Sequence, residues 1–278
     1  MRSVYCRVFL LSLLLAADCR AAFASSQVPV VVPLRIVGHA AIVMATIDGV
    51  IVPLQVDSGD STTAALQKAV LDRVGATPTG QSSKQRYIKG IVSSPWYRVH
   101  RVQIGQAVFT NVAARLDAHP ASDPAKDVGQ KGFLGTGLFK TYRVILDYPD
   151  HTMTLLSKSS VERGPHGCTG SAVSFSSSWH GQPVTKADTD LGQVTLWWDT
   201  GAPATILSRS FVQRATSGRA PGPVMSKRFV LGGTDFGPQR FVVWPMSLPT
   251  GFSGFIGYDF FSRHVVCFDF PDGEVLIR

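Results

Sequence analysis

The chain has 278 residues, of which 45% are hydrophobic and 17% charged, and its formal net charge is +8. This is an ordinary globular composition, long enough for two modest domains. The basic residues are scattered without a block of like charge, which argues against a nucleic-acid-binding protein.

The first 24 residues are typical of a secretory signal peptide. Arg2 and Arg7 precede an apolar run at residues 8–17, and Ala22-Phe23-Ala24 is a typical cleavage site. An apolar run of about ten residues is too short to span a bilayer. We therefore expect a protein exported to the periplasm or the exterior, without stable membrane insertion.

Two cysteines, Cys168 and Cys267, remain after cleavage. They can pair in an oxidising compartment, but Cys267 lies in an apolar strand and equally suits a buried free thiol. His166 lies close to Cys168, yet no second Cys/His pair completes a zinc site.

Abundant Gly and Pro and scarce helical periodicity favour short strands joined by tight turns. In the first half, apolar runs, turn residues and possible caps at Thr62 or Thr63 predict elements in the following order. We expect strands at 28–37, 40–48 and 50–56, a helix at 64–74, a loop at 76–83, an aromatic-rich hairpin at 84–99, strands at 99–104 and 108–116, and a loop at 118–131.

The second half repeats the first. Residues 132–150 align without gaps to residues 254–272, and Asp-Ser-Gly at 57–59 is matched by Asp-Thr-Gly at 199–201. Such self-similarity indicates a duplication. The first unit spans 28–158 and the second spans 170–278, with a linker at 159–169 that is rich in Ser and Gly.

The two units differ in length between their matched motifs. There are 76 residues from Asp57 to Phe133, but 56 from Asp199 to Phe255. Most of the excess lies before Gly105, in the 84–99 hairpin, so the first unit has a lid-like hairpin that the second mostly lacks.

Asp-Ser/Thr-Gly followed in each half by Phe-Leu/Ile-Gly resembles the motif pair of the aspartic peptidases, in particular bacterial, exported, retropepsin-like members with two lobes in one chain. The resemblance covers nearly all of the mature sequence. It implies an all-β fold of two pseudo-symmetric β-barrel lobes with short helices and an active-site cleft between the lobes. The 84–99 hairpin then becomes a flap over the cleft, with Tyr87, Trp96 or Tyr97 as its aromatic residue or as ordinary core or edge aromatics.

The resemblance also implies the roles of the motif residues. Asp57 and Asp199 match the catalytic dyad, Ser58 and Thr200 the residues that cross-link the two loops, and Gly59 and Gly201 the glycines that let backbone N–H groups reach the carboxylates. Phe133-Leu134-Gly135 and Phe255-Ile256-Gly257 match the strands that brace those loops.

Two carboxylates about 3 Å apart cannot both ionise, so they share a proton and activate a water molecule between them. The expected function is that of an aspartic endopeptidase acting on a polypeptide substrate as a monomer, with no metal or cofactor. An alternative is a peptide-binding module that keeps the fold without turnover. A third possibility, a dimer that pairs like lobes, is disfavoured because one flap suffices for one cleft.

Asp60 departs from the family pattern, which usually has a small residue after Asp-Ser/Thr-Gly, as Ala202 is. Its charge could raise the pKa of the dyad or contact a substrate amine, or Asp60 could be a capping or solvent-facing turn residue. Asp147 and Asp269, in the repeated Asp-aromatic-Pro-Asp segments, are expected to be hairpin-turn residues.

Overall fold

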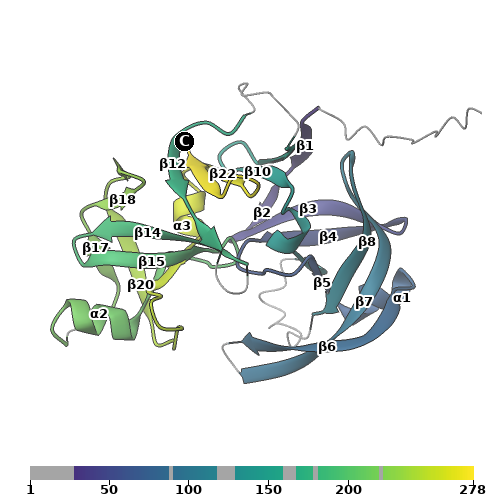
Figure 1. The fold of residues 1–278 in the computed structure, drawn as a ribbon, viewed down its shortest axis with the longest axis horizontal. Helices are drawn as coiled ribbons and strands as arrows, with labels where there is room; N and C mark the ends of the chain where they lie inside the picture. The colour runs from purple at the N-terminus through teal and green to yellow at the C-terminus, as the bar shows by residue number, and fades with distance from the viewer. Residues whose placement is uncertain (1–27, 88–89, 118–128, 159–166, 178–180, 219–221) are drawn as a thin grey trace, which may run out of the picture.

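The computed structural model describes residues 28–278 except 88–89, 118–128, 159–166, 178–180 and 219–221 (Figure 1). The predicted signal peptide, most of the predicted linker, His166 and the far end of the predicted flap therefore lie outside the described residues. The described part is an all-β fold with short helices, as expected.

The first half contains these elements: β1 (Val30–Pro33), β2 (Arg35–Val37), β3 (Ala40–Ile47), β4 (Val50–Asp57), β5 (Ala64–Leu66), α1 (Lys68–Arg73), β6 (Thr77–Tyr87), β7 (Gly90–Ile104), β8 (Ala107–Leu116), β9 (Gly132–Gly135), the 3-10 helix η2 (Thr136–Leu138), β10 (Tyr142–Asp147) and β11 (Thr152–Ser157).

The second half contains β12 (Ser171–Ser174), β13 (Ser176–Ser177), β14 (Pro183–Thr189), β15 (Gly192–Trp198), β16 (Ile206–Ser208), α2 (Arg209–Ala215), β17 (Val224–Ser226), β18 (Phe229–Leu231), β19 (Thr234–Asp235), β20 (Gln239–Trp244), β21 (Gly254–Ile256), α3 (Tyr258–Phe261), β22 (Val265–Asp269) and β23 (Glu274–Ile277).

The first lobe is a closed barrel. Its strands follow the order β2-β3-β4-β9-β5-β8-β7-β6, and an additional pairing of β3 with β7 closes the ring. An Asp48-Gly49 turn, whose two residues have positive φ, joins β3 to β4. The Asp48 carboxylate accepts hydrogen bonds from the backbone N–H groups of His100 and Arg101 at 3.0 and 2.8 Å, which fastens this turn to β7.

The second lobe is an open half-barrel with the order β17-β20-β16-β21-β15-β14-β18-β19, to which β13 adds beside β14. Its core is aromatic. Trp198 and Phe260 meet edge to face at 5.8 Å between ring centroids, and Phe229 packs on Phe241 in the same way. All four rings are fully buried, so large aromatic side chains form the core of this lobe.

A six-stranded sheet joins the two halves. Its order is β1-β11-β10-β22-β23-β12, three strands from each half, and it lies across the top of Figure 1. At its centre Ile145 pairs with Cys267, its own equivalent at the 122-residue offset, so the antiparallel pairing of β10 with β22 expresses the duplication. Cys267 forms a disulfide with Cys168, with 5.5 Å between the Cα atoms.

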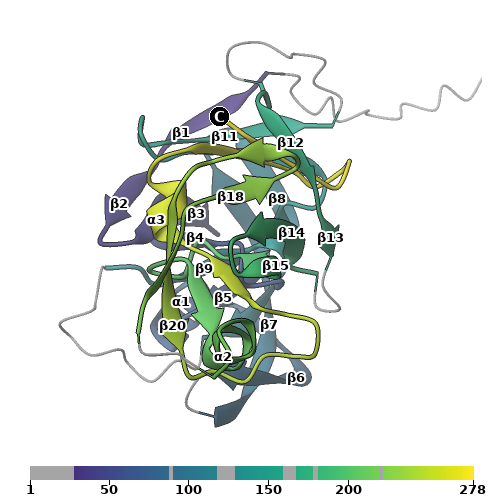
Figure 2. The same ribbon diagram turned by 90° about the vertical axis from the view of Figure 1, so that its left-hand side faces the viewer.

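The β6–β7 hairpin lies at the opposite end of the molecule from this sheet (Figure 2). It is longer than the predicted 84–99 hairpin, because the expected loop at 76–83 is part of β6. The predicted strand at 28–37 is divided into two strands, β1 and β2. The chain leaves the six-stranded sheet after Pro33 and enters the sheet of the first lobe at Arg35.

The predicted helix at 64–74 was wrong in its first residues. Residues 64–66 form β5 because they pair with both β8 and β9, and the helix begins only at Lys68. Thr63 therefore does not cap it, and its hydroxyl donates to the Ala113 carbonyl instead.

Asp147 and Asp269 are hairpin-turn residues, as expected. Each carboxylate accepts a hydrogen bond from the backbone N–H three residues later, at Asp150 and Asp272. Asp269 also forms an ion pair with Arg143 at 2.5 Å across the β10–β22 pair. These aspartates hold hairpins and the central sheet together.

Candidate active site

The two Asp-Ser/Thr-Gly motifs lie at equivalent places in the two lobes. Asp57 is the last residue of β4, and Asp199 directly follows β15. Beside each motif runs a parallel strand of the Phe-Leu/Ile-Gly type, with Asp57 opposite Gly135 in β9 and Trp198 opposite Ile256 in β21. Each aspartate is thus fixed where a buried strand ends.

Gly135, the last residue of β9, and Gly257, which directly follows β21, pack against the two Asp-Ser/Thr-Gly loops. A Cβ atom added to Gly135 would come within 2.6 Å of the Asp60 carbonyl oxygen, and one added to Gly257 within 3.0 Å of the Ala202 carbonyl oxygen. Only glycine leaves room for the loop backbone here, which supports the bracing role that the family resemblance implies.

The two carboxylates face each other's loops. Within each loop the carboxylate accepts a hydrogen bond from the glycine two residues on, at 2.9 Å for both Asp57 with Gly59 and Asp199 with Gly201. A Cβ atom on Gly59 would lie 2.5 Å from Oδ1 of Asp199, and one on Gly201 would lie 3.1 Å from both carboxylate oxygens of Asp57. Each glycine therefore lets the opposite carboxylate approach.

Four hydrogen bonds cross-link the loops with near-twofold symmetry. The Ser58 hydroxyl donates to the Trp198 carbonyl at 2.8 Å and accepts from the Thr200 backbone N–H at 3.0 Å. The Thr200 hydroxyl donates to the Val56 carbonyl at 2.8 Å and accepts from the Ser58 backbone N–H at 2.9 Å. Ser58 and Thr200 are buried, so this reciprocal network fixes the spacing of the two aspartates in a protected environment.

Burial raises the pKa of both Asp57 and Asp199 above the ordinary aspartate value. For Asp57, the charges of Asp199 and Asp60 raise the pKa further, while hydrogen bonds from backbone N–H groups oppose them. For Asp199, the N–H groups of Gly201 and Ala202 and a hydrogen bond with Asp57 oppose the effect of burial, and Asp60 adds to it. The pair therefore keeps a proton at pH values where an ordinary aspartate has lost it.

Asp60 forms an ion pair that the sequence did not predict. Its Oδ2 lies 2.7 Å from the guanidinium of Arg115 in β8, and its Oδ1 accepts from the Thr62 backbone N–H at 2.8 Å. Its charge raises the pKa of both Asp57 and Asp199, which is one of the expected effects. The alternative of a capping or solvent-facing residue is wrong, because β5 rather than a helix follows this loop and the Asp60 side chain is only 15% exposed.

The flap candidates lie at different places on the β6–β7 hairpin. Tyr87 pairs with Gly90 at the last described step, and its side chain lies outside the described residues. The Trp96 indole N–H donates to the Ser83 hydroxyl at 3.0 Å across the hairpin. Tyr97, on the opposite face of β7, packs against the hydrophobic core and has the position of a core residue.

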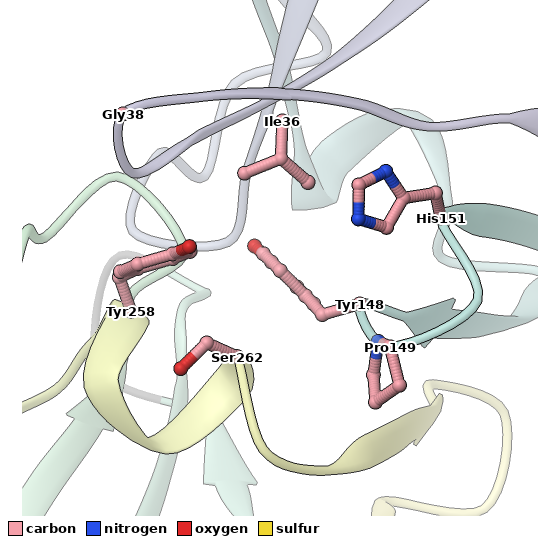
Figure 3. A pocket seen from close by; sticks show the side chains of 7 residues that line it. All are labelled: Ile36, Gly38, Tyr148, Pro149, His151, Tyr258 and Ser262. Atoms are coloured by element: carbon pink, nitrogen blue, oxygen red, sulfur yellow. The ribbon is translucent and has the colours of Figure 1, made fainter.

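A cavity of about 380 Å³ lies beside Tyr148 and Tyr258 (Figure 3). Tyr148 is buried, and its hydroxyl has no hydrogen-bond partner among the described residues. Burial, helped by the charges of Asp57 and Asp199, raises the pKa of Tyr148, so this phenol stays neutral. The cavity includes neither catalytic candidate among its lining residues and is not the expected substrate site.

Sequence reasoning missed three contacts of the catalytic loops. Arg115 reaches Asp60 from β8; Asp259 in α3 accepts hydrogen bonds from Thr205 in the second loop; and Gln182 donates to the Gly59 carbonyl at 3.1 Å. Arg115 and Gln182 lie outside the repeated segments, and Asp259 replaces a glycine, Gly137, of the first repeat, so identity between the repeats did not point to any of the three. Among the described residues, no group of three or more His, Cys, Asp or Glu could hold a metal ion, and no helix is long and apolar enough to cross a membrane.

No known family model and no curated protein matches the sequence. The fold is similar to that of an aspartic proteinase from Irpex lacteus, with a TM-score of 0.62 and 13% identity over 90% of this chain and 97% of the other. At this identity the likeness shows the fold alone: the chain has the two-lobed architecture of an aspartic proteinase.

Proposed function

We propose that the chain is an aspartic endopeptidase that hydrolyses peptide bonds in a polypeptide, with Asp57 and Asp199 as its catalytic dyad. The observation that carries the proposal is the pair of carboxylates on reciprocally cross-linked loops, each lying against the glycine of the other loop. The two-lobed fold adds support, because it is an architecture in which such a pair is known to act.

The chemistry follows from the shared proton. The ionised carboxylate takes a proton from a water molecule, whose oxygen attacks the peptide carbonyl carbon, while the protonated carboxyl polarises the carbonyl oxygen. A proton then passes to the departing amine, the C–N bond breaks, and a carboxyl and an amino terminus form. The roles of acid and base belong to the pair and are not divided between Asp57 and Asp199.

The supporting residues keep this pair in its working geometry. Gly59 and Gly201 each donate a backbone N–H to one carboxylate oxygen and so orient the two acids. Ser58 and Thr200 fix the distance between the loops. Preorganisation of this kind lowers the barrier, because no loop has to be ordered at the moment of reaction.

We further propose that the protein is exported and acts as a monomer. The signal-peptide pattern supports export, and a disulfide between Cys168 and Cys267 suits an oxidising compartment. The reciprocal loop contacts are completed within one chain, so a second copy is not needed to build the site.

The test is cleavage of a reduced, alkylated and unfolded protein by the chain beginning at Ser25, between pH 3 and 8, with new termini identified by mass spectrometry. We expect cleavage by the wild type and a loss of about 10²-fold or more in Asp57→Asn and in Asp199→Asn. Thermal melts of each variant would establish that the loss is not unfolding. Equal cleavage by either variant would contradict the proposed dyad.

The peptide-binding alternative makes a different prediction for the same samples. A folded wild type that binds the unfolded protein at every pH but produces no new termini would favour it. Asp60, the residue that departs from the family pattern, is the feature that could favour this alternative. Its ion pair with Arg115 weakens that argument, because the Asp60 charge has a partner outside the proposed dyad.

A further inference from the structure

The two catalytic loops are held in place by different carboxylates. In the second lobe the carboxylate comes from α3: Asp259 accepts from the Thr205 backbone N–H at 2.5 Å, from the Thr205 hydroxyl at 2.7 Å, and from the Gln239 amide at 2.6 Å. The residue equivalent to Asp60 in this lobe is Ala202, which has no charge to offer.

In the first lobe the carboxylate comes from the loop itself, and the helix position equivalent to Asp259 has no side chain. The equivalent of Asp259 is Gly137, and a Cβ atom there would lie 2.7 Å from the Ser61 carbonyl oxygen, so the loop leaves no room for a side chain. The carboxylate is supplied instead by the loop itself: Asp60 accepts from the Thr62 backbone N–H and from Arg115. Each lobe thus has one carboxylate bonded to its loop backbone, from non-equivalent positions.

The ion pair between Asp60 and Arg115 is largely buried, which strengthens its electrostatic effect. The Arg115 and Asp60 side chains are only 4% and 15% exposed, so the pair is shielded from solvent and salt. Arg115 lies on β8 opposite Trp96 of β7, which anchors it in the strands that carry the long hairpin. Removing either partner would leave the other charge buried without its counterpart.

We propose that Arg115 and Asp60 are a positioning pair that holds the first catalytic loop, as Asp259 holds the second, and that the balance of their charges sets the pH range in which the dyad carries one proton. The functional part of this proposal rests on the proposed peptidase activity. The Asp60 backbone N–H belongs to the hydrogen bonds that hold the Asp57 carboxyl. The Asp60 and Arg115 side chains act on the dyad through the position of the loop and through their charges.

The charges around the dyad give the proposal its direction. Asp60 raises the pKa of both carboxyls of the proposed dyad. The Arg115 guanidinium, 2.7 Å from Asp60, carries the opposite charge and is expected to counteract that effect. Tyr148, which follows β10, interacts with both Asp57 and Asp199, and its raised pKa keeps it neutral. Removing one charge of the Asp60–Arg115 pair should therefore shift the pKa values of the dyad.

Two single substitutions should shift the pH profile in opposite directions. Asp60→Asn removes the negative charge and leaves Arg115, so the alkaline limb of kcat/KM moves to lower pH. Arg115→Gln leaves Asp60 uncompensated, so the limb moves to higher pH. Shifts of about 1 to 2 pH units correspond to unit charges about 6 to 12 Å apart at an effective dielectric constant of about 20. The double variant should return close to the wild-type profile.

Two controls separate charge from structure. Arg115→Lys keeps the charge and should keep the wild-type profile even if stability falls. Asp259→Asn weakens the brace of the second loop, and Asp259 does not appear among the charges that shift the dyad. It should lower stability without moving the limb.

A titration of the aspartate carboxyl groups by NMR in ¹³C-labelled protein follows the same variants without turnover, so the positioning pair is tested even if the proposed peptidase function fails. Opposite shifts of the raised carboxyl pKa values in the two single variants, cancelled in the double, would support the proposal. Shifts in one direction for both, or no shift in either folded variant, would overturn it.

Discussion

The buried cross-link between the loops gives the sharpest prediction about stability. Thr200→Val keeps the shape of a fully buried side chain but removes its hydroxyl, so the Ser58 N–H and the Val56 carbonyl lose their partners. Each buried group left unpaired costs about 1–3 kcal/mol, so the variant should lose about 2–6 kcal/mol of unfolding free energy. That is a large part of the about 5–15 kcal/mol typical of a folded domain.

Urea denaturation of the variant, followed by tryptophan fluorescence, measures this loss. The matched control is Thr200→Ser, which keeps the hydroxyl and removes one methyl group, at a cost of about 1 kcal/mol. Ser58→Thr, which makes the first loop resemble the second, should keep all four cross-links. If Thr200→Val proves no less stable than Thr200→Ser, the hydroxyl network does not hold the loops together and the reasoning fails.

Two further predictions concern the dyad and the disulfide. The pKa of Asp199 is raised in the folded protein, so between the unfolded value of about 3.9 and the folded value the native state binds the extra proton and stability falls as pH rises. Asp199→Asn should therefore gain stability relative to wild type between pH 4 and 7 in melts across that range, and a constant difference would contradict the shift. The disulfide between Cys168 and Cys267 closes a long loop with a separation of 99 residues, so the double Cys→Ser variant should lose about 2–5 kcal/mol in urea denaturation. Reductant should lower the stability of the wild type but not that of the double Cys→Ser variant. If the wild type and the variant are equally stable without reductant, the disulfide contributes little to stability.

The sequence was sufficient to predict the features that repeat. The 122-residue offset and the two Asp-Ser/Thr-Gly motifs predicted a duplicated all-β fold, and the structure pairs Ile145 with its own repeat equivalent, Cys267. The family resemblance implied that Gly59 and Gly201 let backbone N–H groups reach the carboxylates. The structure adds that a side chain at Gly59 would collide with the opposite carboxylate and that one at Gly201 would crowd it.

What the sequence could not predict depends on register. Arg115 and Asp60 are 55 residues apart, and they meet only because β8 pairs with β5 beyond the first catalytic loop. Tyr97 faces the core while its neighbour Trp96 faces the other side of the hairpin, and strand alternation assigns such faces only once the pairing is known. For the same reason residues 64–66 became a strand, although their local pattern suited a helix.

The measurement that tests the central claim most directly is a mutant cycle on the dyad. Cleavage rates of one unfolded substrate would be compared at one pH for wild type, Asp57→Asn, Asp199→Asn and the double variant, all shown to be folded. If the two carboxyls act as one unit, each single variant should lose about as much activity as the double. Additive losses, or full activity in either single variant, would contradict a shared dyad.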